Sequence, residues 1–156
     1  MPKAEKIVVK TVTRPSVEST QALTDWFFDT FDLSGKGDRL EREMFQMIVS
    51  NSLKGTGTSS KSISKSLSVP LSTVIYDLNK FIDCGLVVRK GREYFLRASD
   101  FESTIQELQA EMLTEFNRMM QFASKLDELI EDEIYGRGRG EEREEREGSQ
   151  AAVERG

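Results

Sequence analysis

Histidine is absent from this sequence, and cysteine occurs once, at position 84. Without histidine the chain lacks the commonest general base, the commonest metal ligand and the side chain that changes charge near neutral pH. A single cysteine excludes an intramolecular disulfide and fits a reducing cytoplasm. Because the remaining residues give no positive sign of catalysis, we expect neither an enzyme nor a bound cofactor or metal.

Long apolar runs are also missing. No stretch approaches the roughly 20 apolar residues that cross a membrane, and the first residues show no signal-peptide pattern. The 156 residues suffice for one domain with a core and extensions. We therefore expect a cytoplasmic protein that has no membrane partner.

The net charge of −5 is unevenly distributed along the chain. Positions 54–97 hold eight basic and three acidic residues, whereas positions 98–156 hold seven basic and sixteen acidic residues. Charges are screened over about 8–10 Å at physiological salt, so a basic patch can meet phosphates despite an acidic region elsewhere. The sequence therefore predicts a local basic surface within 54–97.

Two helices separated by a turn are predicted between positions 59 and 83. Ile63 and Leu67 share one face of a short helix, which Ser68-Val69-Pro70 interrupts because proline lacks the donor that a continuing helix needs. Apolar residues of the second helix recur at spacings of three and four: Leu71, Val74, Leu78, Phe81 and Ile82. Gly85 is expected to end this helix, and Cys84 before it is expected to be a buried structural thiol.

A β-hairpin is predicted next, with strands at 86–89 and 93–96 joined through Lys90-Gly91-Arg92. Helix, turn, helix and two-stranded wing is the order of a winged-helix DNA-binding domain, in which the second helix enters the major groove. The sequence therefore predicts a mainly α fold, of the α+β winged-helix kind, over residues 38–97.

The run from Leu67 to Val87 resembles the winged helix-turn-helix transcriptional regulators of bacteria and archaea, the ArsR, MarR and GbsR-like groups. Ser72-Thr73-Val74 opens its second helix and Gly85-Leu86-Val87 follows that helix. The resemblance implies a sequence-specific, double-stranded DNA-binding regulator that pairs as a homodimer through helices outside the winged domain. Winged helices also serve as protein-docking modules, so docking through Ile75 and Tyr76 without DNA binding is the alternative.

The expected DNA contacts fall into three sets. Ser72, Thr73, Tyr76, Asn79 and Lys80 lie on the second helix and are assigned to the major groove. Lys61 and Lys65 are assigned to the DNA backbone, and Arg89, Lys90 and Arg92 of the wing to the flanking groove. Two features weaken the assignment: Lys80 is the only basic residue of the second helix, and Asp77 near phosphates lowers affinity unless it points inward or accepts a hydrogen bond from cytosine.

Residues 1–15 are predicted to form either a flexible arm or an edge strand, and residues 16–37 an aromatic helix followed by a loop. Ser16 to Phe31 has the helical pattern, with an apolar side made by Leu23, Trp26, Phe27 and Phe31. Asp38-Arg39-Leu40-Glu41 resembles a capping box that opens the first, supporting helix of the winged domain.

A long helix is predicted within residues 98–135, opened by a second capping box at Ser99-Asp100-Phe101-Glu102. Its apolar residues from Phe101 to Ile134 recur about every 3.67 residues. A helix of roughly 34 residues spans about 50 Å, too long to be buried against a small winged domain. We therefore expect it to form a homodimer together with the face from Leu23 to Phe31. Alternatively, Met112, Met119 and Met120 could line a pocket for a hydrophobic effector.

Residues 136–156 are highly charged and are expected to be disordered.

Overall fold

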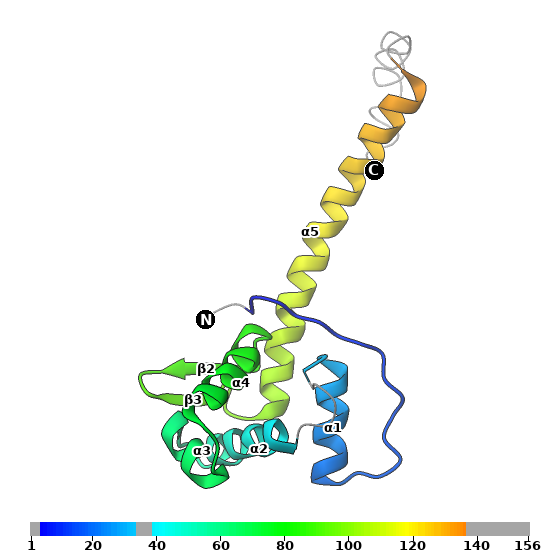
Figure 1. The fold of residues 1–156 in the computed structure, drawn as a ribbon. Coiled ribbons are helices and arrows are strands. Elements are labelled where there is room, and N and C mark those ends of the chain that lie inside the picture. Colours follow the sequence, from blue (N-terminus) through cyan, green and yellow to red (C-terminus); the bar gives the residue numbers. More distant parts are fainter. Residues whose placement is uncertain (1–3, 34–38, 137–156) are drawn as a thin grey trace. The chain divides into compact units, whose positions relative to one another are not determined.

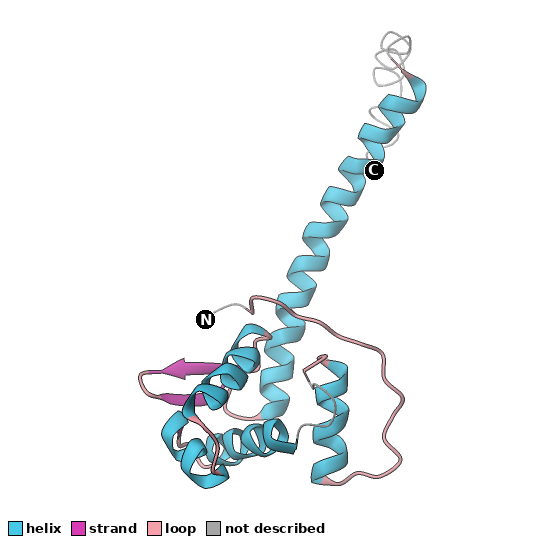
Figure 2. Ribbon diagram, in the orientation of Figure 1, coloured by secondary structure: helices cyan, strands magenta, loops and turns pink. Residues whose placement is uncertain are grey.

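The computed structural model describes residues 4–33 and 39–136. The chain forms two compact units, Met1–Met112 and Leu113–Gly156. The described residues contain five helices and three short strands, so the fold is mainly helical with a small sheet, compatible with an α+β class. Figures 1 and 2 draw the helices together with strands β2 and β3. Among the residues described, no helix combines the length and apolarity that crossing a membrane would take.

Helix α1 spans Thr20–Thr30 and so begins four residues later than the sequence predicts. The Ala22 N–H donates to the Ser19 hydroxyl at 3.1 Å, which satisfies a helix-end donor and fixes the start. The predicted inward face is also wrong in part. Leu23 is exposed, whereas Phe28, outside that face, is almost fully buried.

Three further helices follow: α2 (Arg39–Leu53), α3 (Ser60–Leu67) and α4 (Leu71–Asp83). Ser68 lies between α3 and α4 in a left-handed conformation with φ 55°, and Pro70 immediately precedes α4. The two predicted helices and their turn are therefore confirmed. The predicted capping box at 38–41 begins outside the described residues. Its other member, Glu41, is buried and accepts a hydrogen bond from Lys80 Nζ.

The sheet contains β1 (Thr58–Ser59), β2 (Val87–Lys90) and β3 (Glu93–Leu96) in the order β1-β3-β2, all antiparallel. The hairpin is confirmed, although β2 begins one residue later than predicted. Lys90 pairs with Glu93, which leaves Gly91 and Arg92 as the turn. The prediction of only two strands is wrong, because a two-residue strand such as β1 is too short to show an alternating pattern.

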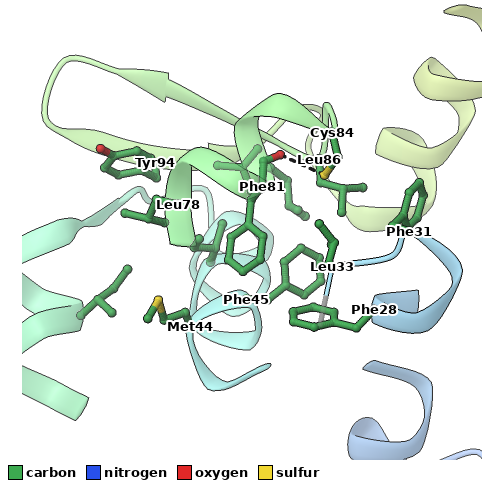
Figure 3. Close-up of a cluster of buried hydrophobic side chains, with 14 of the residues drawn as sticks. Phe28, Phe31, Leu33, Met44, Phe45, Leu78, Phe81, Cys84, Leu86 and Tyr94 are labelled. Atoms are coloured by element: carbon green, nitrogen blue, oxygen red, sulfur yellow. Dashed lines mark hydrogen bonds between the residues drawn. The ribbon is translucent and has the colours of Figure 1, made fainter. Parts of the chain in front are cut away.

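Aromatic rings join three helices in the core (Figure 3). The rings of Phe28 in α1, Phe45 in α2 and Phe81 in α4 meet edge to face, with centroids 5.6–5.8 Å apart. Such aromatic pairs contribute about 0.5–1.5 kcal/mol each beyond the area they bury. Cys84 lies beside this cluster, and its thiol donates to the Phe81 carbonyl at 3.3 Å.

Helix α5 spans Phe101–Tyr135. Asp100, rather than the predicted Ser99, caps it by accepting hydrogen bonds from the Ser103 N–H at 2.7 Å and the Ser103 hydroxyl at 3.0 Å. These bonds lower the pKa of Asp100. Thr104 and Leu108 are buried, but every described residue from position 113 onward is exposed.

The N-terminal residues 4–15 contain no strand, so the edge-strand alternative is wrong. Single hydrogen bonds attach this segment to the helices: Lys6 N–H donates to the Asp83 carbonyl at 2.9 Å and Lys10 N–H to the Thr30 carbonyl at 2.7 Å. The Trp26 indole donates to the Thr13 carbonyl at 3.1 Å. A strand needs a continuous ladder of such bonds, which these separate contacts do not make.

Candidate nucleic-acid interface

Helix α4 presents a polar outer side because its apolar residues are turned into the core. Val74, Leu78 and Phe81 are fully buried at spacings of three and four. The side chains assigned to DNA on the opposite side are exposed: Ser72, Thr73, Tyr76 and Asn79. The helix therefore offers hydroxyl and amide groups to solvent along its length.

Asp77, in the middle of α4, is buried and only 4% exposed. One of its carboxylate oxygens lies 3.9 Å from Lys80 Nζ. The negative charge that would have opposed phosphate binding is therefore directed inward and faces a cation. This burial removes one of the objections that the sequence raises against DNA contact by α4; the other, that Lys80 is the only cation of this helix, remains.

Lys80 is the predicted contact that the structure favours least. Its ammonium lies 2.6 Å from Glu41 Oε1 and 5.6 Å from the centre of the Tyr76 ring. Burial works against the charged form, but the hydrogen bond to Glu41 and the charges of Glu41 and Asp77 outweigh burial and raise the pKa of Lys80. Lys80 thus joins α4 to α2, and its charge is already compensated within the protein.

The two lysines of α3 are fully available. Lys61 and Lys65 are exposed and one helical turn apart, while Ile63 on the inner side of α3 is completely buried. The α3 helix packs against α4. Its two cations are therefore held on an ordered helix that packs against α4.

The β2–β3 hairpin, which corresponds to the predicted wing, carries three exposed cations at its tip: Arg89 and Lys90 in β2 and Arg92 in the turn. Arg89 Nε donates to the Gly91 carbonyl at 2.8 Å, and the Arg89 guanidinium lies 5.8 Å from the Tyr94 ring centre. The Lys90 ammonium lies 5.2 Å from the centre of the Phe95 ring. These contacts leave the positive charges facing solvent, although exposed Glu93 pairs directly opposite Lys90.

Arg97 behaves differently from the other basic residues of this region. Its guanidinium is buried and donates to both Glu111 oxygens, at 2.9 and 3.0 Å, and its Nε lies 3.3 Å from Glu107 Oε1. The hydrogen bonds to Glu111 are the main reason that the pKa of Arg97 is raised. Sequence reasoning missed this cluster, because no local pattern relates a strand end to a helix residue 14 positions away.

The exposed charge of residues 54–97, all of which the structure describes, is still positive. Lys80 and Arg97 are compensated internally, which leaves six exposed cations against exposed Asp83 and Glu93. The six are Lys54, Lys61, Lys65, Arg89, Lys90 and Arg92. This balance is the electrostatic property expected of a surface that meets phosphates.

Neither a reactive thiol nor a metal site is found among the described residues of this region. Burial raises the pKa of the Cys84 thiol to about 11, so the thiol is protonated and unreactive at neutral pH. The described residues contain no group of three or more histidine, cysteine or acidic side chains that could hold a metal ion. What the region does offer is hydrogen-bonding groups and positive charge.

No family model matches the chain, and neither curated proteins nor solved structures give a match. Any function must therefore be inferred from the side chains of this chain.

Proposed function

We propose that this protein is a sequence-specific, double-stranded DNA-binding transcriptional regulator with a winged-helix domain, acting as a homodimer. The observation that supports this most strongly is the pattern of burial on α4. Ser72, Thr73, Tyr76 and Asn79 are exposed, while Asp77 on the same helix is buried. A helix that enters the major groove reads base edges with outward hydrogen-bonding side chains, and a buried carboxylate does not repel the phosphates.

The roles of the residues follow from their chemistry. The Asn79 amide can form two hydrogen bonds to adenine, the hydroxyls of Ser72 and Thr73 can contact several bases, and Ile75 can contact a thymine methyl group. Cations of α3 and the wing bind phosphates irrespective of sequence and set the position of the protein on the duplex. In this proposal α4 supplies specificity, and Lys61, Lys65 and the wing supply most of the affinity.

The homodimer in this proposal uses a smaller surface than the sequence suggests. The face from Leu23 to Phe31 was expected to lack a partner within the chain, but this is wrong: Phe31 is buried, and the Phe27 ring lies 4.7 Å from that of Phe101. The first turns of α5 are likewise packed against other parts of the same chain, through Phe101 and the buried Leu108. What remains exposed and apolar is α5 from position 113 onward, so we assign pairing to that segment.

The first test is a salt titration of binding to duplex DNA. Replacing Arg89, Lys90 and Arg92 together by alanine should weaken binding to every sequence and reduce the slope of log affinity against log salt by up to about three. A matched control replaces three exposed cations elsewhere, Lys6, Arg14 and Arg39, and should leave the slope nearly unchanged. Parent protein whose binding is absent or insensitive to salt would contradict the proposal.

A second test addresses specificity. Replacing Asn79 by alanine should remove discrimination at one base pair, which is worth about 1–3 kcal/mol, while binding to random duplex DNA stays within about twofold of the parent. Selection of preferred sites from a randomised duplex library measures this for the parent and the variant. Identical sequence preferences in the parent and the variant would show that Asn79 does not contact bases.

In a dimer, the two α4 helices should contact half-sites about 34 Å apart, which is one helical turn of DNA.

Protein docking is the second candidate function, and one observation favours it. Leu71 and Ile75 are each 39% exposed and Tyr76 is 67% exposed, which gives α4 a small apolar surface. Such a surface can serve as part of a protein interface. If DNA binding proves absent, replacing Ile75 and Tyr76 by alanine should abolish the partner interaction instead.

A further inference from the structure

The exposed segment of α5, residues 113–135, has a regular apolar seam. Phe116, Met119, Ala123, Leu126 and Ile130 follow one another at alternating spacings of three and four, the pattern of helices packed side by side. The four large members of this seam are 44–55% exposed. Nothing within the described residues covers them.

Apolar residues also flank this seam on both sides. Phe122 (68% exposed) and Leu129 (48%) lie along one edge, and Leu113 (58%), Met120 (61%) and Ile134 (72%) lie along the other. At 100° per residue, these positions extend the mainly apolar face to about 200° of the helix circumference, within which Glu115, Asp127 and Glu133 are acidic. The remaining side is polar up to position 134, with residues such as Gln121, Ser124 and Glu128.

The width of this face decides how many neighbours it needs. A two-stranded coiled coil covers only the narrow central seam, and the edge positions of such a pair are normally charged. A helix of a four-helix bundle instead contacts two neighbours and buries the edges as well. One partner helix would therefore leave Phe122, Leu129, Leu113 and Met120 largely in water, which soluble proteins avoid for an apolar surface of this size.

The described residues offer no other apolar surface that could serve as the second neighbour. Outside α5, exposed large apolar side chains stand mostly alone, as at Val9, Val17 and Leu53. The one group is Leu71, Ile75 and Tyr76 on α4, and three side chains are too few to cover the apolar face of a 23-residue helical segment. A lipid surface is disfavoured too, because the segment has six acidic and two basic residues, whereas helices that lie on membranes are rich in lysine and arginine.

We infer that the partner is further copies of this chain, and that residues 113–134 of four chains form a four-helix bundle. Each helix then has two identical neighbours, which cover the seam and both edges together. The inference rests on the self-association part of the proposed function and extends the dimer to a pair of dimers. It does not depend on whether the protein binds DNA.

The charges of the segment favour antiparallel neighbours. Positions 113–126 carry Arg118, Lys125 and one acid, Glu115, whereas positions 127–135 carry five acids and no base. Parallel helices would place the five acids of one chain beside the five of the next. Antiparallel helices bring the acidic end of one chain next to Arg118 and Lys125 of its neighbour, which is electrostatically favourable.

The mass of the full chain in solution tests the bundle. Light scattering after gel filtration should give four times the chain mass of 17.7 kDa at micromolar concentration. A mass of twice 17.7 kDa would overturn the bundle but leave the DNA-binding dimer standing. The mass of one chain would overturn the bundle and also the dimer. Fourfold mass without salt-sensitive DNA binding would support the bundle and contradict the regulator.

Substitutions separate the seam from the edges. F122Q with L129Q removes one apolar edge and keeps the seam, so the mass should fall by half. M119Q with L126Q disrupts the seam, so the mass should fall to that of a single chain. The control S124Q with E128Q changes the polar side and should keep the parent mass. Equal masses for the edge variant and its parent would overturn the four-chain arrangement.

Charge reversal tests the helix direction. R118E with K125E should raise the concentration at which the assembly dissociates by about tenfold at low salt, because each acidic end then meets further negative charge. The difference from the parent should shrink in high salt. A variant that assembles as tightly as the parent at low salt would overturn the antiparallel arrangement.

Discussion

The two parts of α5 have the same apolar spacing and opposite environments. In the first unit, Thr104 is fully buried and Leu108 is 2% exposed. In the second, Leu126 at an equivalent seam position is 55% exposed. Helical periodicity thus identifies which side of a helix is apolar, but it does not say what covers that side.

The first part of α5 is buried because the folded unit supplies specific partners. The Phe101 ring meets those of Phe27 at 4.7 Å and Phe45 at 5.3 Å, and Arg97 at the end of the hairpin binds Glu111. The second part has no such partner among the described residues. The two parts should therefore respond differently to the same substitution.

The largest contrast is expected for one substitution made in each part. Replacing Leu108 by alanine should lower the free energy of unfolding of the first unit by about 2–5 kcal/mol, because it leaves a cavity in a packed site. Replacing Leu126 by alanine should change that stability by less than about 0.5 kcal/mol, while weakening self-association. Urea unfolding followed by Trp26 fluorescence measures the free energy of unfolding of both variants. Equal destabilisation by the two variants would mean that the two parts are not distinct.

The next contrast concerns two glycines with positive φ, one against α5 and one in open space. A Cβ at Gly85 (φ +86°) would lie 2.6 Å from Leu108 Cδ2 and 2.7 Å from Ala4 Cβ, whereas a Cβ at Gly91 (φ +66°) meets nothing within 4 Å. Both alanine variants incur the left-handed backbone cost of about 1–2 kcal/mol. Gly85→Ala should lose about 1–3 kcal/mol more through overpacking. If urea unfolding gives similar losses of free energy for the two variants, Leu108 of α5 moves aside to make room for the added Cβ at position 85.

The smallest effect is expected from Cys84, on the buried side of the same region. The folded pKa of about 11 exceeds the ordinary value of 9.0, so the unfolded chain loses its thiol proton first as pH rises. This contribution to stability is complete below pH 9 and is lost as pH rises towards 11.

The Cys84→Ala variant isolates this titration from those of other groups. Its stability should fall less steeply than that of the parent between pH 9 and pH 11, as measured by urea unfolding at several pH values. Parallel curves for the two proteins would show that the thiol is not held protonated by burial.

How far the sequence could predict the structure depended on the kind of signal. The turn at Ser68 to Pro70 and the hairpin around Gly91 were predictable, because proline and glycine restrict or free the backbone locally. The start of α1 was placed four residues too early, and the cap of α5 was assigned to Ser99 instead of the adjacent Asp100. Strand β1 was missed, because its two residues pair only with the distant β3.

The features of the candidate site also fall into those that the sequence could predict and those that it could not. Exposure of Lys61, Lys65 and the wing cations followed from their positions opposite apolar residues and at a hairpin tip. The internal compensation of Lys80 by Glu41 and of Arg97 by Glu111 did not, because each pair joins residues that are far apart in the sequence. A count of basic residues therefore overstated the exposed positive charge.

By itself, the sequence determined most of the local structure: the helices, the turn at Ser68 to Pro70, the β2–β3 hairpin, the apolar side of most helices, and where charges concentrate. These depend on backbone preferences and on the spacing of neighbouring residues. Only the tertiary structure decided that Asp77 is buried, that Arg97 is held between glutamates, and that α5 is covered up to Met112 and exposed beyond it. Those outcomes depend on which distant surfaces meet, and no local period carries that information.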